Sequence, residues 1–514
     1  MKFNNIIIVG GGSAGWMSAA TLIKAFPDKK ITVVESPNIP TVGVGESTTQ
    51  LMRRWMHYIG VSDQDLITKC NATHKLSIRF ENFHKNDGKG FHYPFGRLDQ
   101  RFFSISDWFA HQHISKVPFE EFVNDVSPIS YCLDNNKVPN SSLVEGGTFL
   151  GELWNLEKDS AWHFDSNKFH KYLKDDYCLP KGVNHIYGNV ITANTDNSGF
   201  ITSIITDNGE ITGDIFFDCT GFKRVLIEGV MKDEWQGFNN DTYTNAAWAA
   251  ARPYKNKKEE LKLYTNSVAL GHGWVWETPT WERIGTGYSY ASNYINKEAA
   301  LSEFKQYLGP ISEEMEFRHI DMRNGMSNNF WVKNCISIGL SGAFIEPLES
   351  NGLLSVHEFL LTFVNIAEGK DVLNNFDAHS FNHVCREQFL YFADFLTLHY
   401  AMTVRDDTQY WRDIQMQNFT DSRLLKQIYD LRGASFYEIP NKLSADVLGA
   451  TIFLLAGHNV NPYSSFKKYN SEFWGSNIIT NAKELDTIIK SNNLEKQRIT
   501  NTYPDSIDYY KTFH

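Results

Sequence analysis

A glycine-rich turn near the start of the chain constrains its fold more than any other feature. Residues 6–9 read Ile-Ile-Ile-Val, and residues 10–15 read Gly-Gly-Gly-Ser-Ala-Gly, which satisfies the pattern GxGxxG. Small and apolar residues of helical character follow, and a second apolar run at 31–34 ends at Glu35. Strand, glycine turn, helix, strand and acid in this order form the unit that binds a dinucleotide.

Each part of this unit has a physical task. Gly10 permits the tight turn, Gly12 lets the backbone approach a pyrophosphate, and Gly15 lets helix and strand pack closely. The helix start offers N–H groups and a positive dipole end to the phosphates, and Glu35 can accept a hydrogen bond from a ribose hydroxyl. The alternative is a structural glycine turn that binds no nucleotide, and the presence of the complete unit argues against it. The expected phosphate-binding residues are Gly10, Gly12, Ser13, Ala14 and Gly15.

Two later segments distinguish between FAD and NAD, which share this fingerprint. Residues 215–221 read as a strand that ends in Asp218-x-Thr-Gly, and residues 335–342 form another strand that runs into a glycine turn at Gly339. Three nucleotide-type strand ends spread over more than 300 residues fit an FAD domain with two dinucleotide folds, since an NAD domain is complete in about half that length. The prediction is an α/β, Rossmann-like FAD-binding domain of the flavin monooxygenase type.

Composition excludes several other classes of protein. The formal charge of −11 argues against a nucleic-acid surface, which needs a basic stripe. The six cysteines lie far apart without zinc spacing, which predicts free thiols and no metal site. Without a secretion signal or a membrane-spanning apolar run, the expected location is the cytoplasm. Aromatic residues make up 14% of the chain, and most are assigned to the core rather than to a ligand site.

The chain is divided here into two predicted domains. Residues 1–365 form the FAD-binding core, with an inserted substrate-side sheet at about 81–150 and 190–330, and residues 366–514 form a largely helical substrate-binding lobe. Glycine and asparagine at 457–462 should break the last helices. The secondary-structure signals are alternation at 190–193 and 201–206 and helical spacing at 359–364 and 424–428.

Further motifs follow in order along nearly the whole chain. They are Gly-Val-Gly-Glu-Ser-Thr at 43–48, Asn-Ala-Thr-His-Lys-Leu at 71–76, Trp-His-Phe-Asp at 162–165, Trp-Val-Trp-Glu-Thr-Pro at 274–279, Phe-Ile-Glu-Pro-Leu-Glu-Ser-Asn-Gly at 344–352 and Leu-His-Tyr at 398–400. Together they resemble the flavin-dependent halogenases, in particular the tryptophan-halogenase-like group. The run 274–279 is similar to that family's WxWxIP signature, with Thr278 in place of isoleucine.

The resemblance implies an oxidoreductase that halogenates an electron-rich aromatic. Reduced FAD and dioxygen would oxidise a halide ion to hypohalous acid, and a separate NADH-dependent flavin reductase would supply the FADH2. Alternatives that remain open are an FAD-dependent aromatic hydroxylase and a non-catalytic flavin-binding redox module. Homodimer formation is compatible with the sequence. The cofactor residues implied beyond the first turn are Glu35, Gly45, Val190, Asp218, Gly339, Leu340 and Leu353.

Two residues are the expected catalytic groups. Lys75 would capture or polarise the hypohalous acid, because an ammonium can hydrogen-bond the oxidant and a neutral amine can form a haloamine. The alternative for Lys75 is a solvated surface lysine. Glu349 would stabilise the cationic ring intermediate and accept its proton, or would instead stabilise a helix N-terminus. Glu346 is a competing carboxylate in the same turn, and the pattern alone does not separate the two.

Halide and substrate residues complete the predicted site. Backbone N–H groups of Asn351 and Gly352 would bind chloride, bromide or iodide, with a heavier halide favoured because it is easier to oxidise. The family often has threonine at position 351. Trp274 and Trp276 should face the same side of a strand, where they would keep substrate from the flavin or form a core pair.

The substrate side departs from the enzymes that act on free tryptophan. Those enzymes carry His-Pro-Phe where this chain has Tyr93-Pro-Phe95, so Tyr93 stands in place of the histidine. They also have a late tryptophan where spacing to Gly457 places Thr451. Tyr93 and Phe95 can still stack on an aromatic ring. These differences favour a small aromatic substrate of the indole or phenol type over free tryptophan.

Overall fold

The computed structural model divides into two compact units. Unit 1 comprises residues 1–72, 162–251 and 316–392, and unit 2 comprises residues 73–161, 252–315 and 393–514. Each unit therefore consists of three separate stretches of sequence. The domain boundary predicted at residue 365 stays a prediction. The residues that the structure describes are 1–38, 45–96, 98, 118–140, 154–238, 244–417, 419, 422–426, 428, 445–460 and 477–514.

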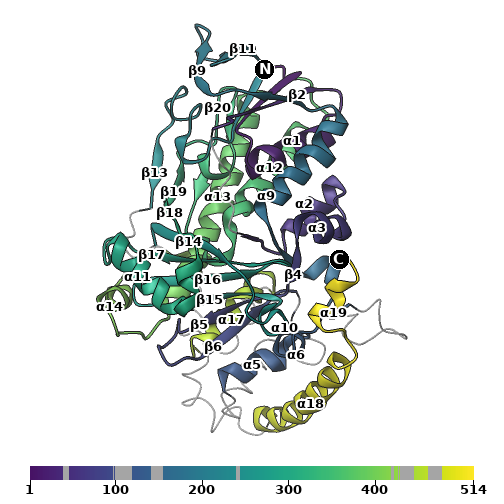
Figure 1. Ribbon diagram of the computed structural model, residues 1–514, viewed down its shortest axis with the longest axis vertical. Coiled ribbons are helices and arrows are strands. Elements are labelled where there is room, and N and C mark those ends of the chain that lie inside the picture. Colours follow the sequence, from purple (N-terminus) through teal and green to yellow (C-terminus); the bar gives the residue numbers. More distant parts are fainter. Residues whose placement is uncertain are drawn as a thin grey trace. The chain divides into compact units, whose positions relative to one another are not determined.

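A largely parallel sheet forms the centre of unit 1 (Figure 1). Its strand order is β20-β21-β12-β1-β2-β8, and only the edge pair β20 and β21 is antiparallel. The strands predicted at 6–9, 31–34, 215–218 and 335–338 are confirmed. The sheet consists of β1 (Asn5–Val9), β2 (Lys30–Glu35), β8 (Asn184–Tyr187), β12 (Ile215–Asp218), β20 (Trp331–Val332) and β21 (Cys335–Ser337).

Both faces of this sheet are covered, which explains why its strands read as continuous apolar runs. Ile7 and Val9 pack with Ile201, Ile204 and Leu226 in one buried cluster. Helices α1 (Ser13–Ala25) and α12 (Leu354–Ala367) pack against each other in the same unit.

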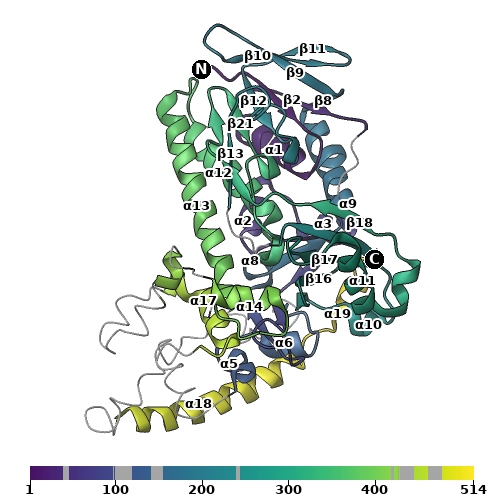
Figure 2. The ribbon, with the colours of Figure 1, turned by 90° about the vertical axis from the view of Figure 1, so that its left-hand side faces the viewer.

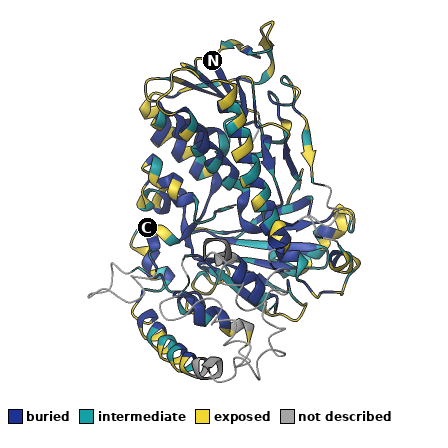
Figure 3. Ribbon diagram, turned by 180° about the vertical axis from the view of Figure 1, so that it is seen from behind, coloured by how far each residue is buried: buried dark blue, intermediate teal, exposed yellow. Residues whose placement is uncertain are grey.

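The alternating segments predicted as strands belong to unit 1. They form a separate antiparallel sheet, and its outer strands carry many exposed residues (Figures 2 and 3). This placement puts them beside the nucleotide-type sheet. The strands are β9 (Val190–Thr195), β10 (Ile201–Thr206) and β11 (Gly209–Thr212).

Unit 2 contains five adjacent strands, in the order β17-β16-β15-β5-β6, of a mainly antiparallel seven-stranded sheet. Only β15 and β5 pair in parallel. A short strand, β4 (Thr73–Lys75), enters this unit directly before β5. The five sheet strands are β5 (Ser77–Glu81), β6 (Gly90–Pro94), β15 (Tyr264–Ala269), β16 (Gly273–Pro279) and β17 (Ile284–Tyr290).

The helical character predicted for the end of the chain is confirmed. Helix α17 ends at Gly457, where the turn signals predicted a break. The completely buried Lys496 anchors α18, because its Nζ donates to the carbonyl oxygens of Asn124 and Asp125 at 3.0 and 2.9 Å. The helices are α13 (Asn375–Ala401), α14 (Gln409–Met416), α17 (Ala445–Gly457), α18 (Asn477–Thr500) and α19 (Ser506–Lys511).

All six cysteines are buried free thiols. Among the helices of the described ranges, none is long and apolar enough to cross a membrane.

Candidate functional site

The GxGxxG turn lies at the carboxyl end of β1, between the ends of β2 and β12. The N–H of Gly10 donates to the carbonyl of Val34 at 2.9 Å, and the N–H of Cys219 donates to the carbonyl of Val9 at 2.8 Å. Gly10 has a φ of +118°, a conformation that L side chains rarely adopt. The turn is therefore fixed to both neighbouring strands at the position where α/β sheets bind nucleotides.

Two glycines of the turn have opposite surroundings. A Cβ at Gly15 would overlap the carbonyl oxygen of Gly10, so this position allows the helix to pack on the turn. A Cβ at Gly12 would meet no atom within 4 Å, so that side of the turn is open to a ligand. The first turn of α1 also contains no acidic residue. These features fit the pyrophosphate of FAD, which Gly12 and the start of α1 would hold.

Glu35 ends β2 and has two basic neighbours. Its Oε2 lies 2.8 Å from Nε2 of His185 and 3.4 Å from Nζ of Lys174. Burial lowers the pKa of His185, and the charge of Lys174 lowers it further. Both contacts use Oε2, and the hydrogen bond of Glu35 with a ribose hydroxyl stays a prediction. The sequence did not identify His185 or Lys174, because they come from a segment about 140 residues further along the chain.

Asp218 is engaged with its own turn. Its Oδ1 accepts from N–H and hydroxyl of Thr220 at 3.0 and 2.6 Å, and its Oδ2 accepts from the N–H groups of Leu226 and Ile227 at 2.8 Å each. The carboxylate is fully buried. These bonds shape the segment after β12, and the predicted role of Asp218 in the cofactor site stays a prediction.

The third glycine turn, at Gly339, lies close to Ala14 in α1. The φ of Gly339 is +73°, and a Cβ there would lie 3.0 Å from Cβ of Ala14 and 3.3 Å from Cγ2 of Val356. The other predicted cofactor residues also belong to unit 1. Gly45 directly precedes β3 (Glu46–Ser47), Val190 begins β9, Leu340 lies in η6 (Gly339–Ser341), and Leu353 ends η8 (Asn351–Leu353).

The two carboxylates of the 344–352 motif have distinguishable surroundings. Glu346 is completely buried, and its Oε2 accepts from the N–H and the hydroxyl of Thr244 at 2.6 and 2.8 Å. Glu349 ends the short helix η7 (Pro347–Glu349) and is 2% exposed. The structure thus gives Glu346 a tethering function, which the sequence pattern could not separate from that of Glu349.

The predicted halide residues begin the turn that leads into α12. The Nδ2 of Asn351 donates to the carbonyl oxygens of Ile345 and Glu346, at 3.3 Å in each case. Its Oδ1 is buried and has no hydrogen-bond partner among the described residues. A Cβ on Gly352 would have Oε2 of Glu46 as its nearest neighbour, at 3.9 Å. Glu46 stands within the 43–48 motif but was not selected from the sequence, and residues 43 and 44 lie outside the described residues.

Lys75 ends β4 in unit 2 and is completely buried. The hydroxyl of Thr73 donates to the carbonyl of Pro279 at 2.6 Å, and the N–H of Leu76 donates to the carbonyl of Leu263 at 2.7 Å. The first bond joins β4 to the end of the Trp-x-Trp strand and the second joins Leu76 to the residue before Tyr264, so both fix the backbone around Lys75. Its burial excludes the alternative of a solvated surface lysine.

An aromatic cluster surrounds the end of β6. Nζ of Lys75 lies 5.1 Å from the ring centroid of Phe95, and the rings of Tyr93 and Phe95 lie 5.4 Å apart in an edge-to-face arrangement. Tyr93 also contacts Phe453 at 6.1 Å and Phe395 at 6.3 Å. The sequence missed Phe395 and Phe453, because only the fold brings α13 and α17 to β6.

Trp274 and Trp276 confirm the predicted arrangement on one face of β16. Their ring centroids are 6.0 Å apart. Trp274 is 1% exposed, whereas Trp276 is half-buried. Thr451, at the place of the late tryptophan of the family, is buried in α17.

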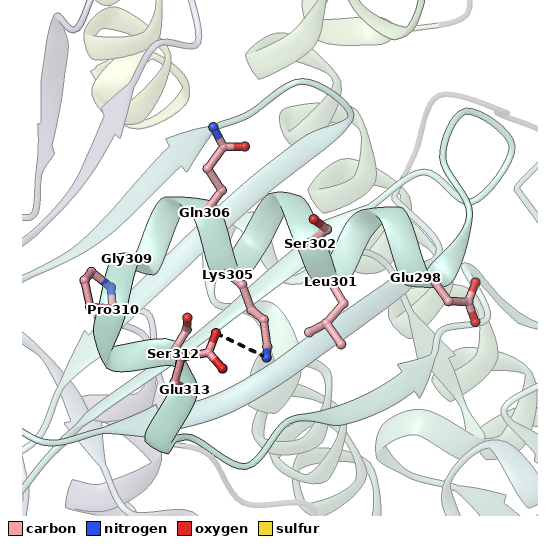
Figure 4. A pocket seen from close by; sticks show the side chains of 9 residues that line it. All are labelled: Glu298, Leu301, Ser302, Lys305, Gln306, Gly309, Pro310, Ser312 and Glu313. Carbon is pink, nitrogen blue, oxygen red and sulfur yellow. Dashed lines mark ion pairs between the residues drawn. The ribbon is translucent and has the colours of Figure 1, made fainter.

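A surface pocket of about 540 Å³ in unit 2 contains none of these residues (Figure 4). It lies along α11 (Lys297–Leu308) and η5 (Gly309–Glu314), where Lys305 and Glu313 form an ion pair of 3.8 Å. Within the described ranges, no group of three His, Cys, Asp or Glu side chains could hold a metal ion.

The candidate residues therefore fall into two sets. The dinucleotide turns, Glu349, Asn351 and Gly352 belong to unit 1, and Lys75, Trp274, Trp276 and the aromatic cluster belong to unit 2.

Comparisons with known proteins identify the family. The model of the tryptophan halogenase family matches residues 5–476. The 7-chloro-L-tryptophan 6-halogenase KtzR of Kutzneria sp. is 33% identical over 81% of this chain and 83% of its own length. The structure resembles that of VirX1, with a TM-score of 0.88 and 33% identity over 99% of both chains. It also resembles the tryptophan 6-halogenase SttH of Streptomyces toxytricini, with a TM-score of 0.84 and 28% identity over 99% of both chains. The chain thus belongs to the tryptophan halogenase family of flavin-dependent oxidoreductases, which act on aromatic substrates.

Proposed function

We propose that this enzyme uses FADH2, dioxygen and a halide ion to form hypohalous acid, which Lys75 directs onto an electron-rich aromatic substrate. The observation that carries the proposal is the complete burial of Lys75 beside the ring of Phe95. A lysine without contact to solvent is costly unless it has a function or a firm set of partners.

The residues of unit 1 bind the cofactor and the halide in this proposal. Bound FAD supplies the redox chemistry that activates dioxygen. Gly12 and the N-terminus of α1 bind its pyrophosphate, and Oε1 of Glu35 accepts a hydrogen bond from its ribose. The backbone N–H groups of Asn351 and Gly352 hold the halide ion.

The residues of unit 2 direct the oxidant. The ammonium of Lys75 donates a hydrogen bond to the oxygen of hypohalous acid, which makes the halogen more electrophilic. The aromatic ring attacks the halogen, the oxygen leaves as water after it takes up a proton, and the ring carbon loses its own proton. Glu349, which belongs to unit 1, is the proposed general base that accepts that proton. The balance is one aromatic C–H and one hypohalous acid converted to one carbon–halogen bond and one water.

The aromatic cluster sets the substrate class. Tyr93, Phe95 and Phe453 present ring faces and edges that suit a flat aromatic molecule. Tyr93 and Thr451 replace the residues that enzymes of free tryptophan use. We infer an indole or phenol substrate.

The proposed reaction also implies a partner enzyme and a cellular compartment. A separate NADH-dependent flavin reductase supplies the reduced cofactor. Six buried free thiols fit the reducing cytoplasm. Homodimer formation remains a prediction.

A halide-competition assay tests the proposed function. The enzyme would be combined with FAD, NADH, a generic flavin reductase, indole or a phenol, and chloride, bromide or iodide, and products would be identified by mass and isotope pattern. Halogenated product is expected, most readily with bromide or iodide. Oxygenated product without halide would favour the hydroxylase, and an FAD-loaded enzyme without any product would favour the redox module.

A further inference from the structure

Glu46 lies against the predicted halide turn although no part of the mechanism uses it. The strand β3 pairs with β7 (Ala161–Phe164), with Glu46 opposite Phe164 and Ser47 opposite His163. The hydroxyl of Ser350 donates to that of Ser47 at 3.0 Å, which ties β3 to the turn that precedes Asn351. Oε2 of Glu46 is the nearest atom to a Cβ built on Gly352, at 3.9 Å.

The surroundings of Glu46 favour its neutral form. Part of the residue reaches the surface, but burial of its carboxylate raises its pKa from 4.5 to about 7. The segments that contact β3 are β7 and the turn at Ser350. Asp165 caps α9 (Ser166–Lys171), and Arg53 of α2 (Met52–Ile59) pairs with Asp63 at 2.6 Å. The other titratable groups are His163 on β7 and Glu349 on η7, together with Lys168, His170 and Lys171 of α9 and Arg54, His57 and Tyr58 of α2.

The halide turn already contains buried acceptors. Glu349 is 2% exposed, and Oδ1 of Asn351 is a buried acceptor without a hydrogen-bond partner among the described residues. An ionised Glu46 would add negative charge beside the place where an anion binds, and would repel it. A neutral carboxylic acid instead offers an O–H donor.

We propose that Glu46 is a binding residue of the halide site, which donates a hydrogen bond from its neutral acid to the halide at Gly352 and excludes the halide when ionised. This inference rests on the proposed function of Asn351 and Gly352 as the halide site. It adds a donor from β3 to the backbone N–H groups of the turn.

The test measures halide binding directly. Chloride and bromide salts would be titrated into the FAD-loaded enzyme, and binding would be followed by the broadening of the halide NMR signal at about pH 6 and about pH 8. For the unmodified enzyme, the dissociation constant should rise about tenfold between these pH values, because Glu46 ionises between them. Glu46→Gln keeps a hydrogen-bond donor and cannot ionise, so its dissociation constant should be low and the same at both pH values.

Controls separate this inference from the function on which it rests. Glu210→Gln changes an exposed carboxylate on β11 and should retain the full pH dependence. Gly352→Val should abolish halide binding at both pH values if the turn is the site, and unchanged binding would refute the halide site itself. If Gly352→Val abolishes binding but Glu46→Gln retains the tenfold pH dependence, only the assignment of Glu46 is wrong. FAD content would show that each variant is folded, and Glu46→Asp would replace a Glu46→Gln variant that does not fold, with a shifted pH midpoint expected.

Discussion

Arg224 is a buried cation in unit 1, and its guanidinium bonds to several acceptors. Its Nε donates to Glu228 at 2.6 Å, its Nη1 donates to the hydroxyl of Ser327 at 2.7 Å and to the carbonyl of Ser341, and its centre lies 4.9 Å from the ring of Trp235. Arg224 is 0% exposed. Because the buried acceptors on Ser327 and Ser341 would lose their donor, Arg224→Ala should lower the free energy of unfolding by about 3 to 5 kcal/mol in urea denaturation.

Arg323 provides a matched control for this prediction. It contacts the same Glu228 at 3.1 Å and lies 4.9 Å from the same ring, but it is 43% exposed. Arg323→Ala should therefore cost less than about 1 kcal/mol. Equal losses for the two variants would show that burial does not determine the contribution of Arg224.

The raised pKa of Glu46 also predicts how stability depends on pH. The native state binds the proton of this acid more tightly than the unfolded chain, whose pKa is 4.5, because the native pKa is about 7. Stability contributed by the neutral acid is therefore present below about pH 4.5 and lost as pH rises through about 7, up to about 3 kcal/mol. Glu46→Gln should remove this loss, so the variant should gain stability over the unmodified enzyme at about pH 8 but not at about pH 5. An identical pH profile for both proteins in urea denaturation would contradict the assignment.

The glycine turn between β1 and α1 yields a prediction at the scale of one element. Gly12→Ala places a methyl group in open space, so its melting temperature without FAD should stay unchanged while its FAD dissociation constant rises at least about tenfold. Gly15→Ala places the same group on the carbonyl oxygen of Gly10, so its melting temperature should fall by about 4 °C or more. Calorimetry and FAD fluorescence titration would measure both. A lower melting temperature of Gly12→Ala, or unchanged FAD binding by this variant, would refute the prediction that FAD binds at the open side of the turn next to Gly12.

The sequence was sufficient for elements whose signals are local. The strand–turn–helix unit at 5–25 and the shared face of Trp274 and Trp276 follow from spacing alone, and the structure confirms both. The sequence could not show the bond from Thr244 to Glu346, which spans 102 residues, because such pairs depend on the folded chain. The contacts of Glu46 with Gly352 and of Tyr93 with Phe453 were missed for the same reason.

The division of the whole chain was the least accessible feature. Unit 2 joins strands from 77–94 with strands from 264–290 into one sheet, so no single boundary along the chain separates the two units. A sheet that forms between distant segments leaves no compositional boundary in the sequence.

The substrate class is a property of the assembled enzyme. If Tyr93 and Thr451 take the places of the residues that free-tryptophan enzymes use, as the sequence predicts, indole or a simple phenol should be halogenated with a kcat/KM at least about tenfold above that for L-tryptophan. Initial rates of halogenated product, measured by chromatography under equal halide and FADH2 supply, would check this. L-tryptophan as the preferred substrate would refute the inference drawn from these two positions.

The central claim is that the buried Lys75 directs the oxidant onto the aromatic substrate. The most direct measurement compares halogenated product, FADH2 reoxidation and hypohalous acid captured by an added trap in Lys75→Ala and in Lys85→Ala, whose lysine is exposed in the same unit. The account predicts that Lys75→Ala loses at least about a hundredfold of product while FADH2 is still reoxidised and trapped oxidant persists, and that Lys85→Ala matches the unmodified enzyme. Halogenated product at the unmodified rate in a folded, FAD-loaded Lys75→Ala variant would contradict it.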